Sequence, residues 1–195
     1  MRKAREDGYR SRAAFKLLEI NTRDRLLIPG ARVVDLGAAP GGWSQVAVQK
    51  TSPGGRVVAI DLLEIAPLPG VTVLQGDFRE EGMRRKLADA LGGERAAVVL
   101  SDLSPNISGI ASSDQARAAE LVRLALEFCR AHLAPGGAFL VKVFQGEEFA
   151  GLLREMKAMF HEVRTLKPSA SREESRETYL LCRRHFAKDL QSNSR

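Results

Sequence analysis

The residues best suited to chemistry are aspartates placed at the ends of short apolar runs. Asp35 lies near the end of RVVDL, Asp61 ends RVVAID, Asp77 follows VTVLQ, and Asp102 follows AAVVLS. In an open α/β sheet, ligands bind at the carboxyl ends of the strands. One acid at such a place is commonplace, but a series of them predicts a ligand site along that edge.

A glycine-rich stretch, GAAPGGW (37–43), follows the first run. Gly37, Gly41 and Gly42 permit a close approach of the backbone to a ligand, although any tight strand-to-helix turn also favours glycine. The stretch is not G-x-G-x-x-G, so it lacks the pyrophosphate cradle of an NAD enzyme. Asp61 stands at about the interval at which dinucleotide-type folds place an acid for ribose hydroxyls. S-adenosylmethionine (SAM), which has a ribose and an adenine but no phosphate, fits this combination better.

These residues must be positioned by alternating strands and helices. Short β-branched runs predict strands, and the longer amphipathic stretches between them predict helices. Strands are expected at 32–36, 56–61, 71–75, 96–102, 138–144 and 178–182, and helices near 43–50, 80–90, 114–133 and 147–159. Such alternation favours parallel strands joined by right-handed crossovers, with helices covering the sheet. The expected class is α/β.

Length and composition predict one domain spanning residues 1–195, with 1–20 as a basic helical lead-in and 187–195 as a polar tail. Cys129 and Cys182 form neither a CxxC pair nor a zinc motif, so both are expected to be buried thiols and no metal site is predicted. No stretch approaches the roughly 18 apolar residues of a membrane helix, and no signal peptide is visible. We therefore expect a cytoplasmic monomer.

The formal net charge is +6, and much of the basic excess lies near the N-terminus. That distribution is consistent with an anionic partner such as RNA. The residues expected to contact phosphates are Arg2, Lys3, Arg5, Arg10, Arg12 and Lys16 in the lead-in, and Arg172, Arg176, Arg183, Arg184 and Lys188 near the other end. Phosphate contacts position RNA without reading its sequence, so specificity is expected to come from the shape of the RNA or particle.

Seven motifs, taken in order, resemble those of the FtsJ family of SAM-dependent ribosomal RNA 2′-O-methyltransferases. They are SRAAFKL, VVDLGAAPGGWSQ, DLL, QGDF, SDLSPNISG, APGGAFLVKVFQGE and SRETYL, and the resemblance covers residues 9–182. It implies a Rossmann-like SAM-dependent methyltransferase fold, with a mostly parallel seven-stranded sheet and helices on both faces.

The resemblance also implies which residues bind the cofactor. The corresponding positions lie in the glycine-rich loop and at the ends of the following strands: Gly41, Trp43, Asp61 for the ribose, Asp77 for the adenine, and Asp102 near the reacting methyl group. A tryptophan at the start of a helix also serves packing, and for Trp43 that interpretation stays open.

The family's catalytic tetrad corresponds to Lys16, Asp102, Lys142 and Glu177, all present in this chain. A ribose 2′-hydroxyl is a poor nucleophile near neutral pH, so the protein must orient it and help its proton leave. Our hypothesis makes Lys142 the base, because desolvation and a second ammonium from Lys16 would both increase its neutral fraction. Asp102 and Glu177 would fix its amine, although their negative charges act against the neutral form. Lys16 would also contact the incoming nucleotide.

Each tetrad residue also has an ordinary structural interpretation. A lysine in a strand often extends along the surface to solvent, and Lys16 fits a solvated basic helix. Glu177 has arginine neighbours with which it could pair. Asp102 could cap a helix, although the next helical pattern begins only near Asp114. The coincidence of four such residues at matching motif positions favours the tetrad.

Family members most similar to this chain modify a uridine in large-subunit ribosomal RNA, on the assembled subunit. The resemblance therefore implies the rRNA of the large ribosomal subunit as partner. Two rival functions remain, a methyltransferase of tRNA or cap riboses and a catalytically silent ribosome assembly factor, and an intact tetrad argues against the second. Family members usually carry a longer basic N-terminal arm, and a truncated arm is expected to affect RNA affinity more than chemistry.

Overall fold

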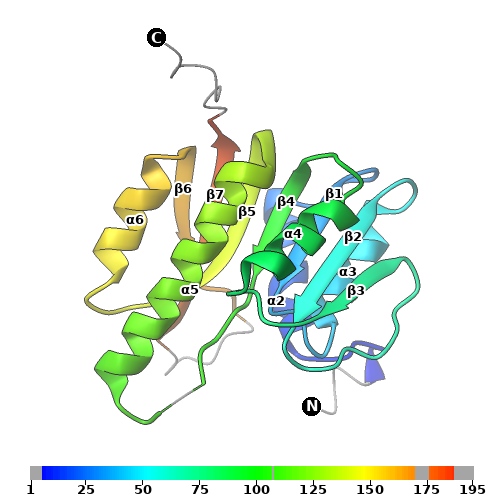
Figure 1. Cartoon of the computed structure of the whole chain (residues 1–195). Coiled ribbons are helices and arrows are strands. Elements are labelled where there is room, and N and C mark those ends of the chain that lie inside the picture. The colour runs from blue at the N-terminus through cyan, green and yellow to red at the C-terminus, as the bar shows by residue number, and fades with distance from the viewer. Residues whose placement is uncertain (1–5, 107, 170–175, 187–195) are drawn as a thin grey trace.

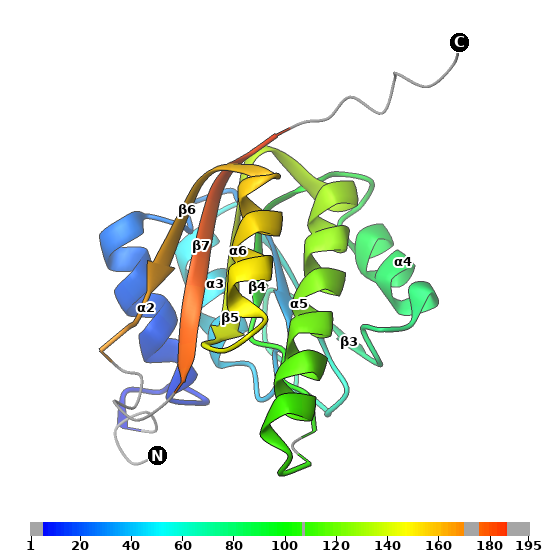
Figure 2. The same cartoon turned by 90° about the vertical axis from the view of Figure 1, so that its left-hand side faces the viewer.

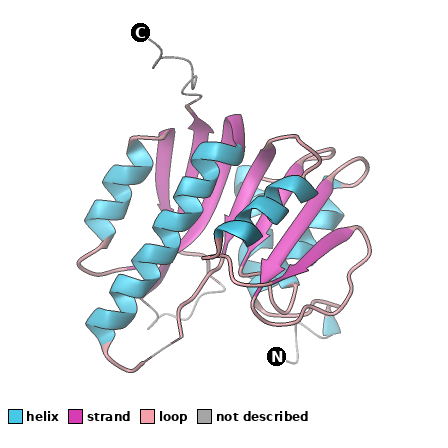
Figure 3. Ribbon diagram, viewed as in Figure 1, coloured by secondary structure: helices cyan, strands magenta, loops and turns pink. Residues whose placement is uncertain are grey.

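The computed structural model describes residues 6–106, 108–169 and 176–186, which form a seven-stranded sheet with helices on both faces (Figure 1, Figure 3). The strands are β1 (Arg32–Leu36), β2 (Arg56–Asp61), β3 (Val71–Gln75), β4 (Ala96–Ser101), β5 (Leu133–Phe144), β6 (Phe160–Leu166) and β7 (Glu177–His185). The helices are α2 (Ala13–Asp24), α3 (Gly42–Thr51), α4 (Glu81–Ala90), α5 (Ala111–His132) and α6 (Phe149–Lys157). The expected seven-stranded, mostly parallel α/β fold is confirmed.

The strand order is β3-β2-β1-β4-β5-β7-β6. Strands β1 to β5 pair in parallel, whereas β7 pairs antiparallel with both β5 and β6. The order reverses between β1 and β4, and the crevice at such a point is the usual place for a ligand. Because β7 runs the opposite way, its first residues lie at the same edge as the carboxyl ends of the parallel strands.

The central strands are buried on both faces, which explains their unbroken apolar runs. Successive side chains alternate between the two helical layers. Val34 and Leu36 of β1 belong to the core formed with α4, α5 and α6, whereas Val33 packs with α2 and α3. Figure 2 shows α2 on one side of the sheet and α5 on the other.

Strand β6 was not predicted from the sequence. It lies at the edge of the sheet, and only the two ends of its segment FHEVRTL are buried, so it lacks the apolar run that marks an inner strand. Strand β5 begins earlier than expected because Leu133 pairs with Ala96, ahead of a register shift between the two strands.

The helix of the basic lead-in, α2, starts and ends later than the predicted range of 1–20. Residues 8–12 precede it as turns and bends. Residues 1–5 and the predicted polar tail, 187–195, lie outside the described residues. Within the part of the chain that the structure describes, none of the helices is both long and apolar enough to cross a membrane.

The C-terminal end of α2 is anchored to the edge formed by β6 and β7. The buried carboxylate of Asp24 accepts hydrogen bonds from Arg164 of β6 and from Arg23. Arg183 of β7 donates to the Asp24 carbonyl oxygen. Since Lys16 lies about two turns before Asp24 on this helix, the anchor fixes where Lys16 meets β7.

We predict that Asp24→Asn lowers the free energy of unfolding by about 1–2 kcal/mol near neutral pH, because charge-assisted hydrogen bonds are lost. Burial raises the pKa of Asp24, but the hydrogen bonds and charges of Arg164 and Arg23 outweigh it and lower that pKa. The stabilisation is thus present above the ordinary aspartate pKa and lost as the pH falls through the folded-state pKa. Urea unfolding of the unchanged protein and the variant, near neutral pH and at about pH 3, measures the difference in their free energies of unfolding at each pH. Equal differences at the two pH values would contradict the prediction.

Candidate active site

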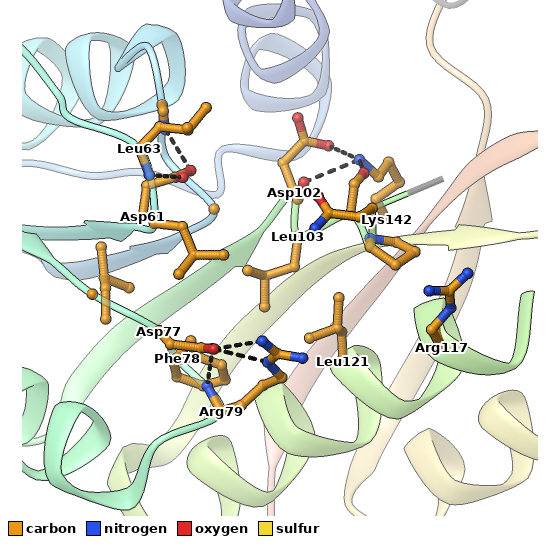
Figure 4. Close-up of a pocket in the computed structure, with 18 of the residues that line it drawn as sticks. Asp61, Leu63, Asp77, Phe78, Arg79, Asp102, Leu103, Arg117, Leu121 and Lys142 are labelled. Carbon is orange, nitrogen blue, oxygen red and sulfur yellow. Dashed lines mark hydrogen bonds and ion pairs between the residues drawn. The ribbon is translucent and has the colours of Figure 1, made fainter. Parts of the chain in front are cut away.

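A cavity of about 440 Å³ opens at the carboxyl edge of the sheet, where the strand order reverses (Figure 4). The glycine-rich loop, the chain after β2, β3 and β4, and parts of α5 and β5 line it. Figure 4 shows Asp61, Asp77 and Asp102 on different sides of this space. Three of the four strand-end acids therefore share one cavity of a size suited to a small ligand.

Gly37 determines how closely two walls of the cavity approach. Its φ of 74° lies in the left-handed region. A Cβ atom at this position would lie 2.9 Å from backbone atoms of Leu103, on the opposite wall. Only glycine meets both demands, so the loop after β1 packs directly on the chain after β4.

Asp61 ties two loops together. Its Oδ2 accepts a hydrogen bond from the Ala39 amide (2.9 Å), and its Oδ1 accepts one from the Leu63 amide (2.9 Å). A carboxylate has about four lone-pair sites, so both oxygens keep acceptor capacity. Asp61 can therefore hold the loops and still accept hydrogen bonds from a pair of adjacent hydroxyls, such as those of a ribose.

Asp77 lines the cavity but is bound by Arg79. The Arg79 Nη2 lies 2.6 Å from Oδ2, and the Arg79 backbone amide donates to Oδ1 (2.9 Å). Hydrogen bonds from Arg79 hold the pKa of Asp77 below its usual range, although burial acts in the other direction. The carboxylate predicted to meet an adenine is thus ionised and already holds an exposed arginine in place.

Asp35 is fully buried and does not line the cavity. Burial raises its pKa to about 7, against the hydrogen bond that Ser44 Oγ donates (2.6 Å), and the carboxylates of Asp102 and Asp61 raise it further. Ser44 lies in the first turn of α3, so Asp35 connects the end of β1 to that helix. Its role is to support the glycine-rich loop rather than to contact a ligand.

Lys142 of β5 is directed at Asp102, with only 6% of its side chain exposed. Its Nζ lies 3.1 Å from Asp102 Oδ1 and donates to the Asp102 carbonyl oxygen (3.0 Å) and to Ser104 Oγ (2.5 Å). Three oxygens therefore match the three donors of the ammonium group. Lys142 does not extend to solvent, and Asp102 is no helix cap, because α5 begins at Ala111 with Ile110 at its N-cap position.

A second ion pair joins α2 to β7. Lys16 Nζ lies 3.2 Å from Glu177 Oε2 and donates to the Tyr179 hydroxyl (3.2 Å), which in turn donates to Asp102 Oδ1 (3.4 Å). Tyr179 stands opposite Lys142 in the pairing of β5 with β7. Burial, and then the charges of Asp102 and Glu177, raise the pKa of Tyr179, so its hydroxyl stays protonated. One connected network therefore contains the whole predicted tetrad.

The network divides the tetrad differently from the sequence hypothesis. Glu177 binds Lys16 and not the amine of Lys142. Tyr179, to which the sequence analysis gave no role, bridges the two ion pairs. Its position relative to Glu177 could have indicated this role. Residues two apart on a strand face the same side of the sheet, so Tyr179 lies on the same side as Glu177.

Two predicted cofactor residues do not line the cavity. Trp43 is 2% exposed, and its Nε1 donates to the Ala13 carbonyl oxygen (2.7 Å). Its ring lies 5.8 Å from that of Tyr179, so the packing interpretation holds for this side chain. Gly41, with φ of 104°, precedes α3, and a Cβ atom there would lie 3.1 Å from Arg10 Nη1.

The basic residues expected to bind RNA fall into three groups. Arg10 and Arg183 donate to backbone carbonyl oxygens of this chain and Lys16 pairs with Glu177, whereas Arg12, Arg176 and Arg184 are exposed. Those outside the described residues are Arg2, Lys3, Arg5, Arg172 and Lys188. No group of three or more His, Cys, Asp or Glu suited to a metal ion occurs in the described part of the chain.

The sequence matches the family described as FtsJ-like methyltransferase over residues 9–185. A ribosomal RNA large subunit methyltransferase E of Nitrosomonas europaea is 55% identical over 181 residues, covering 93% of this chain and 88% of the relative. The protein of the same name from Thiobacillus denitrificans is 56% identical over 184 residues, covering 94% and 84%.

Solved structures with a similar fold include a ribosomal RNA methyltransferase of Plasmodium falciparum. It superposes with a TM-score of 0.82 at 29% identity, over 91% of this chain and 98% of that chain. Fibrillarin of Aeropyrum pernix, solved with natively bound S-adenosyl-L-methionine, has a TM-score of 0.60 at 18% identity, over 89% and 75%. At this level of identity, the similarity to fibrillarin shows a shared fold only.

We predict that Gly37→Ala weakens SAM binding by at least about tenfold, because the new methyl group meets the Leu103 backbone and displaces a cavity wall. Gly136→Ala is the matched control: its φ of 73° imposes the same backbone strain, but no atom lies within 4 Å of the added Cβ. Calorimetric titration of both variants with SAM measures the effect. Equal affinity in the two variants would show that the close approach at Gly37 does not shape the cavity.

Proposed function

Because the chain belongs to the FtsJ-like methyltransferase family, we propose that it uses SAM to methylate the ribose 2′-hydroxyl of a uridine in large-subunit ribosomal RNA, on the assembled subunit. The observation that carries the proposal is the Lys142–Asp102 pair at the wall of a cavity that Asp61 and Asp77 also line.

The residues around the cavity fit SAM. Asp61 offers free acceptor sites for the ribose hydroxyls, and Asp77 offers a carboxylate for the amino group of adenine. Apolar side chains, among them Ile60 and Leu103, supply surface for the flat adenine ring. Gly37 brings the backbone of two walls together. When bound, SAM supplies a methyl group already activated by its sulfonium, so the protein has to act on the hydroxyl.

Lys142 is the residue placed to accept the hydroxyl proton. In its neutral form, Nζ takes that proton as the 2′-oxygen forms its bond to the methyl carbon and the bond from that carbon to sulfur breaks. The three oxygens around Nζ stabilise the resulting ammonium. General-base assistance of this kind is typically worth about 10²–10⁴ in rate.

Lys16, Glu177 and Tyr179 keep this base in place. Glu177 neutralises Lys16, whose side chain is 16% exposed. Tyr179, kept protonated by its surroundings, fixes Asp102 Oδ1. An arrangement with four matched polar groups supports an enzyme over a catalytically silent binding protein.

The names of the relatives and the net charge of +6 support ribosomal RNA as the substrate. The test is transfer of labelled methyl from SAM to large ribosomal subunits that lack the modification, with free rRNA and tRNA alongside. We expect label on a uridine ribose of the subunit. Label on tRNA alone would move the protein to another substrate class, and no label on any RNA would contradict the proposal.

Lys142→Ala is expected to lower turnover at saturating SAM by about 10²–10⁴. Lys142→Arg should fail as well, because a guanidinium group does not give up its proton. Single-turnover rates, with SAM affinity measured separately, distinguish lost chemistry from lost binding. Near-normal turnover in either variant would exclude Lys142 as the base.

Tyr179→Phe is expected to lower turnover by about fivefold while SAM affinity stays unchanged, because Asp102 loses a neutral donor worth about 1 kcal/mol. The ring, which packs against Trp43, is retained, so the fold should persist. Single-turnover rates and unfolding curves of the variant check this. A fall in stability without a fall in rate would make Tyr179 purely structural.

A further inference from the structure

We propose that Arg10 is a positioning residue for the cofactor cavity, which it shapes by clamping the glycine-rich loop to the loop after β2. The inference deepens the proposed function and rests on the use of SAM. From the sequence, Arg10 is expected to contact RNA phosphates, but its guanidinium group donates to the protein's own backbone carbonyl oxygens.

The contacts of Arg10 reach both loops. Nη1 donates to the Ala66 carbonyl oxygen (2.6 Å) and Nη2 to that of Pro67 (2.7 Å), both in the loop after β2. A longer contact runs from Nη1 to the Pro40 carbonyl oxygen (3.4 Å) in the glycine-rich loop. Gly41 leaves room for the guanidinium, since a Cβ atom there would stand 3.1 Å from Nη1.

The segment that carries Arg10 is itself held in place. The Arg10 amide donates to Gln45 Oε1 (3.1 Å), and Gln45 Nε2 donates to the Gly8 carbonyl oxygen (2.7 Å). A Cβ atom on Gly42 would collide with Ser11 Oγ. Residues 8–11 therefore pack tightly on the first turns of α3, and Arg10 extends from a fixed base.

The two clamped loops are walls of the cavity. Gly37 and Ala39 line it from one loop, and Asp61 and Leu63 line it from the other. Inside, the Ala39 amide bonds to Asp61. On the surface, Arg10 supplies a further connection between the two loops.

The clamp depends on the shape of arginine and not only on its charge. A guanidinium group presents donors in a rigid fork, which here reaches two successive carbonyl oxygens at once. A lysine at this position would keep a positive charge for RNA but present a single ammonium. Arg10→Lys thus separates the clamp from a phosphate contact.

The experiment is calorimetric titration with SAM of the full chain carrying Arg10→Ala, Arg10→Lys or Arg12→Ala. Arg12 is the matched control, because it lies two residues away and is exposed. We expect both Arg10 variants to bind SAM about tenfold more weakly, since two charge-assisted hydrogen bonds are lost. Arg12→Ala should bind SAM like the unchanged protein.

Kinetic and stability measurements distinguish a role of Arg10 in shaping the cavity from a general contribution to the stability of the fold. The KM for SAM should rise in both Arg10 variants while kcat at saturating SAM is retained, which a merely destabilised protein would not show. If the Arg10 variants do not fold, Gln45→Ala, which releases the Arg10 amide, should give a smaller shift of the same kind. Normal SAM affinity in Arg10→Lys, or in a folded Gln45→Ala where that variant is needed, overturns the clamp. Failure of the unchanged protein to bind SAM would instead overturn the proposed function.

Discussion

Only 6% of the Lys142 side chain is exposed. A buried ammonium group needs hydrogen-bond acceptors around it, and this requirement determines how the residues at the carboxyl edge of the sheet are arranged. The chain after β4 supplies Asp102 and Ser104, and they reach Lys142 because β4 and β5 are neighbouring parallel strands. Strand β7 enters antiparallel beside β5, so its first residues arrive at the same edge. A parallel β7 would have placed Tyr179 near the opposite edge.

The remaining polar groups extend this first pair into a network. Tyr179 can connect Lys16 with Asp102 because burial and two carboxylates keep its hydroxyl protonated. Lys16 reaches Glu177 because α2 is anchored at its other end through Asp24. In a low-dielectric site each such bond depends on its neighbours, so the geometry around Lys142 is determined collectively.

Several basic residues serve the protein's own backbone or carboxylates. Arg10 bonds to loop carbonyl oxygens, Arg183 bonds to the end of α2, and Arg79 holds Asp77. These arginines keep their positive charge, but their geometry is fixed by contacts within the protein. The contacts of Arg10 also join the N-terminal segment to the glycine-rich loop and to the loop after β2.

The sequence by itself determined the alternating elements and the acids at the strand ends, because burial and side-chain period leave a local pattern in the chain. It did not reveal the polar edge strand β6, which lacks such a pattern. Partner choice inside the site was decided by the tertiary structure: Lys16 and Glu177 are 161 positions apart and meet only through the packing of α2 on the sheet. The same holds for the burial of Trp43 against Tyr179 and for the bonding of Arg10 to backbone carbonyl oxygens. Residue type shows which interactions are possible, but only the folded chain decides which groups come within bonding distance.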